Sequence, residues 1–298
     1  MGIATLVKSA EINAPGLHVL TDEELRDLQL LLVCMMKDIA AICRENDITW
    51  SLGGGSLLGA VRHKGFIPWD DDMDLTMPRL DFEKFKTVFP GKYSEKYELK
   101  LPGDKGFLYH FPKIYRKNTI AQNIQSVPGE VERISIDIFI MENVSDNAVL
   151  RTMHGGLCNI LLGIDSAIRM KLCKDNLLKY GANSPQLCSA VKKRAVLASF
   201  FSFLKLEQWL KISDKVFSLC KNKNTEYIVI PSGNGHFFGE LFLRKEMLTL
   251  KLAEFENQQF FIPENPECYL KVRYGNNYIE IPPKNNIEQH VFVQFNLA

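Results

Sequence analysis

The most concentrated acidic segment of the chain is residues 69–75, WDDDMDL, which contains four aspartates. Side chains two residues apart on a strand share a face, so Asp72 and Asp74 should point the same way while Met73 and Leu75 pack into the core. Carboxylates held side by side either raise a pKa or bind a cation, and oxygen ligands suit Mg²⁺ or Mn²⁺. A solvated acidic turn is the alternative, and the alternating apolar residues disfavour it.

A third candidate ligand, Asp137, is the only charged residue in the segment 134–140, ISIDIFI. A lone carboxylate among β-forming residues is costly unless it is paired or binds a metal. Taken alone, Asp137 could also be a cap or a satisfied hydrogen-bonding group of the core. Together with Asp72 and Asp74, it predicts a catalytic site in which three carboxylates converge on one divalent cation.

A glycine-rich turn precedes the acidic segment in the sequence. The backbone N–H groups of Gly54, Gly55 and Ser56 could approach an anion, and a helix beginning at Ser56 or Leu57 would add its positive end. Glycine triplets also occur in plain tight turns. The order of strand, Gly-Gly-Ser turn, short helix and Asp-x-Asp strand is what favours a phosphate-binding site.

Further candidate substrate-binding residues are basic or acidic side chains near these two motifs. Arg62, His63 and Lys64 lie in the intervening segment and could hold donor phosphates by charge-assisted hydrogen bonds, although each could also be a surface charge. Asp71 and Lys113 complete the set. The general base stays open, because the metal ligand Asp137 or the neighbouring Asp71 or Asp70 could accept a hydroxyl proton.

The elements that must position these residues follow from local patterns. Thr21 and Glu24 have capping-box spacing and precede apolar residues at helical intervals, which predicts a helix over 22–45. Pro78 can open a second helix, with apolar residues on its buried side as far as Phe89. Strands are predicted over 48–52, 72–77, 97–101, 111–116 and 133–141, helical structure over about 146–222, and short strands from 227 onwards. The fold class is therefore α+β, a mixed sheet core with an additional helical region inserted into it or packed beside it.

The composition of the whole chain narrows its partners and its location. With 36 basic and 35 acidic side chains the formal charge is +1, and no basic, aromatic-interleaved stripe indicates nucleic-acid binding. Seven cysteines without a Cys-x-x-Cys pair suit reduced thiols of a cytosolic protein. The N-terminal residues lack the apolar run of a signal peptide, and no apolar stretch reaches the roughly 20 residues of a spanning helix. We therefore expect a soluble, cytoplasmic protein.

The segment 191–209 mixes basic and large apolar residues. It could form a weak contact with a membrane surface that carries a lipid-linked acceptor. The clustering of its aromatic residues around the helix favours the other interpretation, a core helix with a basic end.

The segment 51–85, SLGGGSLLGAVRHKGFIPWDDDMDLTMPRLDFEKF, resembles the LicD family of phosphotransferases, whose wider relatives include the fukutin-type proteins. Weaker similarity follows in 111–120, 135–144 and 269–283, and the helical region is poorly covered. The resemblance implies a nucleotidyltransferase-like fold over a single domain, residues 1–298. It places the phosphate-binding turn at Gly54, Gly55 and Ser56.

The same resemblance implies the metal pair Asp72 and Asp74 with Asp137 as the third acid, and a CDP-activated donor. Family members place phosphocholine or alditol phosphate on a cell-surface glycan or a lipid-linked glycan acceptor. Two alternatives stay open: a true nucleotidyltransferase, which transfers the nucleotide (NMP) moiety, and a non-catalytic binding protein of the same fold.

Overall fold

The computed structural model describes residues 16–127, 129–283 and 291–297. Most of the N-terminal segment in which we expect no signal peptide lies outside these residues. Within them, all seven cysteines are free, which agrees with the prediction of reduced thiols. None of the described helices is long and apolar enough to span a bilayer.

The first long helix, α2 (Asp22–Glu45), confirms the prediction made from its capping box. The Thr21 hydroxyl accepts a hydrogen bond from the Glu24 N–H, and the Glu24 carboxylate accepts one from the Thr21 N–H. Its apolar stripe includes Leu32, Met36 and Ile39, all fully buried. This helix contacts β7 and packs beside α4, so it covers one part of the central sheet.

The central sheet is mixed, as predicted. Its main path has the order β2–β3–β7–β5–β4, in which β3 and β7 run parallel and the other neighbours run antiparallel. Strands β8 and β9 extend it from the far end of β7. The strands are β2 (Ser51–Leu52), β3 (Asp74–Pro78), β4 (Tyr97–Lys100), β5 (Lys113–Arg116), β7 (Ser135–Asn143), β8 (Tyr227–Val229) and β9 (Leu241–Leu243).

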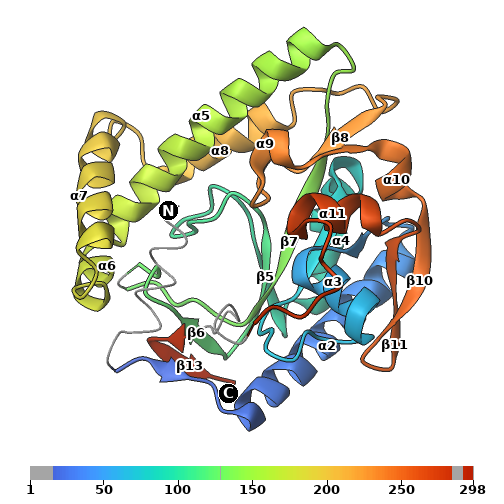
Figure 1. Cartoon of the computed structure of the whole chain (residues 1–298), viewed down its shortest axis with the longest axis horizontal. Helices are drawn as coiled ribbons and strands as arrows, with labels where there is room; N and C mark the ends of the chain where they lie inside the picture. Colours follow the sequence, from blue (N-terminus) through green and yellow to red (C-terminus); the bar gives the residue numbers. More distant parts are fainter. Residues whose placement is uncertain (1–15, 128, 284–290, 298) are drawn as a thin grey trace.

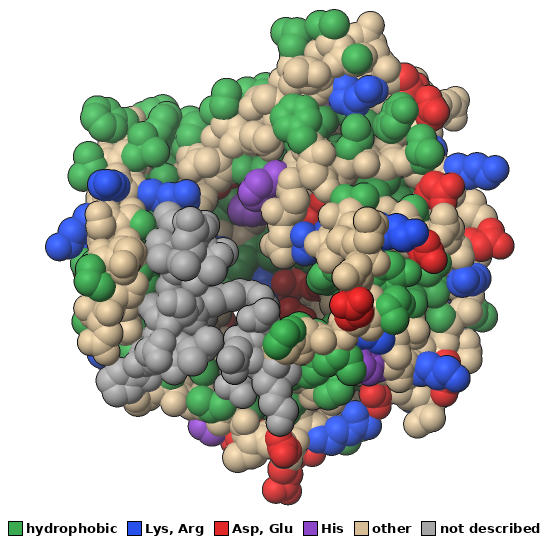
Figure 2. Space-filling view, viewed as in Figure 1, with side chains coloured by type: hydrophobic (Ala, Val, Ile, Leu, Met, Phe, Trp, Pro, Cys, Tyr) green, Lys and Arg blue, Asp and Glu red, His purple; other side chains and the backbone are tan. Residues whose placement is uncertain are grey.

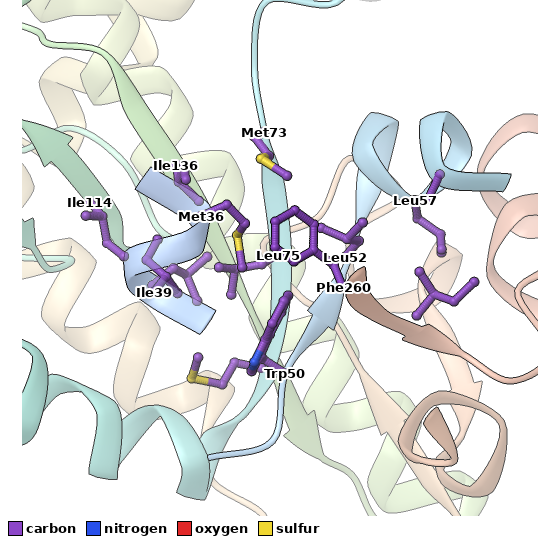
Figure 3. Close-up of a cluster of buried hydrophobic side chains, with 14 of the residues drawn as sticks. Met36, Ile39, Trp50, Leu52, Leu57, Met73, Leu75, Ile114, Ile136 and Phe260 are labelled. Atoms are coloured by element: carbon purple, nitrogen blue, oxygen red, sulfur yellow. The ribbon is translucent and has the colours of Figure 1, made fainter. Parts of the chain in front are cut away.

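Two helices and a hairpin complete the core around this sheet. Pro78 is the N-cap of α4 (Arg79–Tyr93), which contacts β3, β4 and β7. The hairpin β10 (Leu250–Phe255) and β11 (Gln258–Pro263) contacts β2 and α3 (Gly54–His63). In Figure 3, Met73 and Leu75 lie among buried side chains of α2, β7 and β11. Both side chains are completely buried, which confirms the prediction that Met73 and Leu75 pack into the core.

The helical region is formed by α5 (Ala148–Leu172), α6 (Lys174–Tyr180), α7 (Pro185–Phe200) and α8 (Leu206–Phe217), as predicted for 146–222. Helix α5 leaves the end of β7 and runs across the top of Figure 1, with α6 and α7 at its other end. A second cluster of buried apolar residues joins this region to the segment before and after β5. The helical region and the sheet therefore face one another.

Several short elements were not predicted. They include β6 (Ile120–Gln122) and β1 (His18–Val19); their partners β13 (Gln294–Asn296) and β12 (Val291–Phe292) belong to the short strands predicted after residue 227. The helices α9 (His236–Gly239), α10 (Arg244–Leu248) and α11 (Glu267–Tyr274) interrupt the predicted run of C-terminal strands. Each is eight residues or fewer, too short for a clear helical periodicity in the sequence.

The interpretation of 191–209 as a core helix is wrong for most of its length. Only Leu187, Val191 and Ala198 of α7 are buried. Phe200, the last residue of α7, and Phe203, in the turn that follows, are 75% and 72% exposed. The large apolar residues here face solvent because α7 packs against its neighbours through one narrow side.

Candidate active site

The parallel pairing of β3 with β7 brings together two of the three predicted acids. Asp74 and Asp137 are directly opposite in the register, and the Asp137 N–H donates to the Met73 carbonyl at 3.1 Å. Adjacent strands lie roughly 4.8 Å apart, so the Cα atoms of the two aspartates are neighbours in space. In the sequence, 62 residues lie between them. Asp72 precedes β3 by two residues and lines the cavity described below.

The acids strongly affect one another. Burial raises the pKa of Asp74 well above its ordinary value, and the negative charges of Asp72, Asp137 and Asp70 raise it further, while Lys113 opposes the shift. Like charges held this closely in a site of low dielectric cannot all ionise without a compensating cation. The cluster therefore has the electrostatics of a cation-binding site.

Lys113 supplies one such positive charge. In the register of β5 with β7, Lys113 lies opposite Asp137, and its ammonium group contacts the two carboxylate oxygens at 2.8 and 3.0 Å. Ser135 Oγ also donates to Asp137 Oδ1 at 3.2 Å. The Lys113 ammonium lies 4.4 Å from the centre of the Tyr109 ring, a cation–π contact. Lys113, predicted only as substrate-binding, is thus an integral part of the acidic cluster.

The glycine turn packs directly against the carboxylates. A Cβ atom on Gly54 would lie 2.0 Å from Asp74 Oδ2, and one on Gly55 would lie 2.6 Å from Asp70 Oδ2. Gly54 also has φ +49°, a conformation that other residues rarely adopt. Only glycine therefore allows the N-terminus of α3 to approach the acids this closely.

Hydrogen bonds fix this turn to β3 and to the C-terminal region. The Asp74 N–H donates to Ser56 Oγ at 2.9 Å, and the Gly53 N–H donates to the Asp74 carbonyl at 3.0 Å. The Gly54 N–H donates to the hydroxyl of Tyr269 at 3.1 Å. Sequence reasoning missed Tyr269, although it opens the segment 269–283 that carried part of the family resemblance.

The three basic residues after the turn lie at the other end of α3. Arg62 is eight residues beyond Gly54, about 12 Å along the helix. Its guanidinium donates to the carbonyls of Tyr278 and Glu280. Lys64 ends α3 in a left-handed conformation and pairs with Glu254 of β10 at 3.8 Å. The contacts of Arg62 and Lys64 connect α3 to neighbouring segments. Arg62, His63 and Lys64 do not line the cavity that lies beside the acids, which is described next.

A cavity of about 700 Å³ lies between the sheet and the helical region. Figure 2 shows this face hollowed near its middle, with acidic side chains inside. Five polar lining residues of the sheet and the acidic segment form what we call the sheet wall: Asp71, Asp72, Lys113, Ser135 and Asp137. Five polar lining residues of the helices form the helical wall: Asn159, Asp165, Ser166, Arg169 and Arg194. A volume of this size suits a small organic ligand.

The donor chemistry of the sheet wall fits a divalent cation, since its acidic ligands are carboxylates. The described residues contain no three His, Cys, Asp or Glu side chains already arranged to hold a metal ion. Lys113 contacts both oxygens of Asp137. The three-carboxylate site at Asp72, Asp74 and Asp137 therefore stays a prediction, and it requires Asp137 to exchange this lysine for a metal.

Sequence reasoning also missed the helical wall. A weak signal was present, because Asn159, Ser166 and Arg169 recur at helical spacing in the mainly apolar helix α5. Nothing in that pattern indicates that this face lines a cavity opposite the aspartates. The pairing of β5 with β7 and the course of α5 decide this.

Comparison with known protein families finds a match to part of this chain. Residues 47–154 match the family described as "LicD/FKTN/FKRP, nucleotidyltransferase domain". The matched range contains the glycine turn, the four clustered aspartates, Lys113 and Asp137. It ends within α5, so most of the helical region lies beyond it.

One relative is similar over most of both chains. The lipopolysaccharide cholinephosphotransferase LicD of Haemophilus influenzae is 28% identical over 275 residues, which cover 89% of this chain and 95% of the relative. Uncharacterized proteins of Rickettsia typhi and Rickettsia prowazekii are 38% and 35% identical over 71 and 77 residues. Each of these two matches covers 24% of this chain and less than a third of the relative.

Proposed function

We propose, for this member of the LicD/FKTN/FKRP nucleotidyltransferase family, that it transfers a phosphorylated alcohol from a CDP-activated donor to a hydroxyl of a cell-surface glycan. The transferred group is phosphocholine or an alditol phosphate. The similarity to a lipopolysaccharide cholinephosphotransferase supports this substrate class. The observation that carries the proposal is the pairing of Asp74 with Asp137, which lines a cavity of about 700 Å³ together with Asp71 and Asp72.

The residues of the sheet wall suit the two reactants in different ways. Lys113 is the cation of this wall and would bind a phosphate oxygen of the donor. Asp71 lines the cavity, whereas Asp70 lies against Gly55 and Asp137 contacts Lys113. We therefore assign to Asp71 the acceptance of the proton from the attacking hydroxyl.

A bound Mg²⁺ or Mn²⁺ would be held by Asp72, Asp74 and Asp137, and would neutralise charge on the donor diphosphate. The chain itself contributes orientation. The glycine turn lets α3 begin against Asp74 and Asp70, so the positive end of this helix adds to the field at the acids. The acceptor oxygen forms the new P–O bond as the bond from the same phosphorus to the CMP oxygen breaks, and CMP leaves.

The test is incubation of the full chain with Mg²⁺, a glycan acceptor, and CDP-choline, CDP-ribitol or CDP-glycerol in turn. We expect CMP release and a phosphodiester product with at least one donor. A product that carries the whole CMP moiety would show attack at the proximal phosphorus and support the nucleotidyltransferase alternative. Donor binding without turnover for any acceptor would support the binding-protein alternative.

We further propose that the helical region contacts the membrane surface that carries a lipid-linked acceptor. Five apolar side chains in the first half of α5 are at least 42% exposed, at positions 149, 150, 153, 157 and 160, and at helical spacing these form one stripe about 100° wide. Phe200 at the end of α7 and Phe203 in the turn after it are exposed and extend the apolar surface, and hydrophobic side chains gather over α5 and α7 in Figure 2.

Charge favours a lipid surface as the partner of this apolar face. Residues 146–222 contain twelve basic and five acidic side chains, although the whole chain is nearly neutral. Lys192 and Lys193 are exposed on α7, next to the apolar end. Basic residues beside large apolar ones are typical of helices that bind anionic membranes at the interface.

A further inference from the structure

The cavity contains an unusual concentration of unsatisfied polar atoms. Among the described residues, four cavity-lining side chains have a buried polar atom without a hydrogen-bond partner: His110 Nδ1, Asn159 Oδ1, Asp165 Oδ1 and Arg169 Nε. Each such atom destabilises the folded protein unless a ligand or water satisfies it. Their occurrence together at one cavity points to a bound polar partner.

Packing and hydrogen bonds position these groups. Asp165 is 1% exposed, and its other oxygen accepts a hydrogen bond from Ser213 Oγ of α8 at 2.6 Å. The Arg169 guanidinium lies over the Tyr109 ring at 4.4 Å. Arg194 of α7 donates to Ser166 of α5 at 3.0 Å, which holds the two helices of this wall together. The unsatisfied atoms therefore belong to side chains with fixed surroundings.

The protonation states of His110 and Asp165 let each side chain both donate and accept hydrogen bonds. Burial, helped by the charge of Arg169, lowers the pKa of His110 to about 3, so its imidazole is neutral and has one donor and one acceptor nitrogen. Burial raises the pKa of Asp165 to about 7, against the effect of its Ser213 hydrogen bond. Near neutral pH its carboxyl group can therefore donate as well as accept.

The mixture of donors and acceptors selects the chemical class of the ligand. Arg169 Nε can only donate and Asn159 Oδ1 can only accept, whereas a hydroxyl group does both. A phosphate would place acceptor oxygens against Asn159 and Asp165. A quaternary ammonium would have no hydrogen to donate and would meet the positive charge of Arg169. A neutral group with several hydroxyls satisfies all four atoms.

We infer that the helical wall, with His110, is a subsite for a neutral sugar of the acceptor, which it holds with a hydroxyl directed towards the sheet wall. This inference rests on the proposed function for the identity of the acceptor. It assigns to the helical region the selection of the acceptor, and to the sheet wall the binding of the donor. Asp165 and Asn159 are positioning residues in this arrangement.

The kinetic test uses Asp165→Leu and Asn159→Leu in the full chain. Each change should raise the acceptor KM roughly tenfold, which corresponds to one lost buried hydrogen bond, and leave the donor KM within about twofold. The melting temperature of Asp165→Leu should change little, because removal of an incompletely satisfied buried carboxyl group offsets the loss of its hydrogen bond from Ser213. Equal changes in both KM values, or a lower melting temperature with unaltered KM values, would overturn the inference.

Ser213, the hydrogen-bond donor to Asp165, offers a matched control. Ser213 does not line the cavity but donates to Asp165. Ser213→Ala should lower the melting temperature and change the acceptor KM far less than Asp165→Leu does. If Ser213→Ala raised the acceptor KM as much as Asp165→Leu, the effect would come from packing of α8 and the subsite assignment would be wrong.

A binding experiment separates this inference from the proposed reaction. Saturation-transfer NMR on the wild-type chain would use delipidated core oligosaccharide of lipopolysaccharide, phosphocholine and inorganic phosphate as separate probes. Oligosaccharide binding that both leucine variants abolish supports the subsite even if no donor is ever turned over. The inference fails if the oligosaccharide does not bind, which would leave ordered water as the partner of these atoms, or if phosphocholine or phosphate binding is lost in the same variants.

Discussion

The carboxyl group of Asp74 lies beside both the glycine turn and the other acids of the site. It packs on Gly54, faces Asp137 across two parallel strands, and has a pKa raised by burial and by its acidic neighbours. A residue under such repulsion contributes little to stability in the absence of a cation. This repulsion supports the prediction that Asp74 serves binding or chemistry.

We expect Asp74→Asn to abolish turnover and to leave the metal-free melting temperature unchanged or slightly higher. The amide keeps the shape of the side chain and removes one of the repelling charges. Activity assays with Mg²⁺ and thermal melts without metal check the two parts. Asp175→Asn, on the exposed surface of α6, is the matched control and should alter neither. Retained activity in Asp74→Asn would contradict the catalytic assignment, and a large fall in melting temperature would show a structural role.

The second prediction at this scale concerns pH. The folded chain holds the Asp165 proton up to about pH 7, whereas an ordinary aspartate releases it near 3.8. The folded state therefore binds more protons between these values, and the free energy of unfolding contributed by Asp165 decreases as pH rises through this window. Asp165→Asn should remove this decrease.

Denaturant unfolding of the wild type and of Asp165→Asn at about pH 5 and about pH 8 measures that difference. Relative to the wild type, the variant should gain stability at the higher pH, by a few kcal/mol at most. Other titrating groups are common to both proteins and cancel. An identical pH dependence in the two proteins would contradict a raised pKa for Asp165.

At the scale of elements, β7 connects the site to the helical region. Its first residues carry Asp137, and its last pair with β8 before the chain enters α5. Near that end, Arg79 at the start of α4 contacts Glu142 of β7 and donates to Asp214 of α8 at 2.7 Å. One guanidinium thus joins α4, the sheet and the helical region.

We expect Arg79→Met to lower the free energy of unfolding by roughly 3–5 kcal/mol, because it leaves the buried Glu142 without its cation. The Glu142 side chain is only 2% exposed, and burial raises its pKa against the effect of Arg79. A second change, Glu142→Met, should recover most of that loss. Asp214→Asn is the control: this carboxylate is 37% exposed, so its loss should cost about 0–1 kcal/mol. Denaturant unfolding of the wild type, of Arg79→Met, of Glu142→Met and of the double variant completes a double-mutant cycle. If the two single changes in the free energy of unfolding simply add up in the double variant, Arg79 and Glu142 are not coupled.

At the scale of the whole molecule, charge and apolar surface are unevenly distributed. The sheet wall is acidic, whereas the helical region is net basic and carries exposed apolar residues on its outer side. The two walls of the cavity therefore belong to regions of opposite character. This arrangement would let a membrane-bound acceptor enter beside the helical region while the donor occupies the acidic side.

This arrangement predicts binding to vesicles that contain anionic lipid, and weaker binding to neutral ones. Phe200→Ser combined with Phe203→Ser should reduce the bound fraction several-fold, since each removes exposed apolar area from the contact. Lys192→Glu with Lys193→Glu should reduce binding to anionic vesicles selectively. Co-sedimentation measures both effects. The double change Lys84→Glu and Lys86→Glu, on α4, is the matched charge control; equal loss in that variant would indicate non-specific attraction.

The sequence by itself determined the features that depend on neighbouring residues. The capping box and apolar periodicity gave the bounds of α2, and the alternation around Met73 and Leu75 gave their burial. Glycines followed by Asp-x-Asp indicated the resemblance to the LicD family and two of the candidate acids. Each of these signals is local, because helix caps, turns and strand alternation depend on residues only a few positions apart.

Only the tertiary structure decided which distant groups meet. The register of β5 with β7 gives Asp137 its lysine, and α5 brings Asp165 to the cavity opposite the acids. The same packing places Arg62 at the far end of α3 and leaves Phe200 exposed. Such outcomes depend on strand register and helix packing between segments far apart in the sequence, and a side chain's own type does not determine what surrounds it.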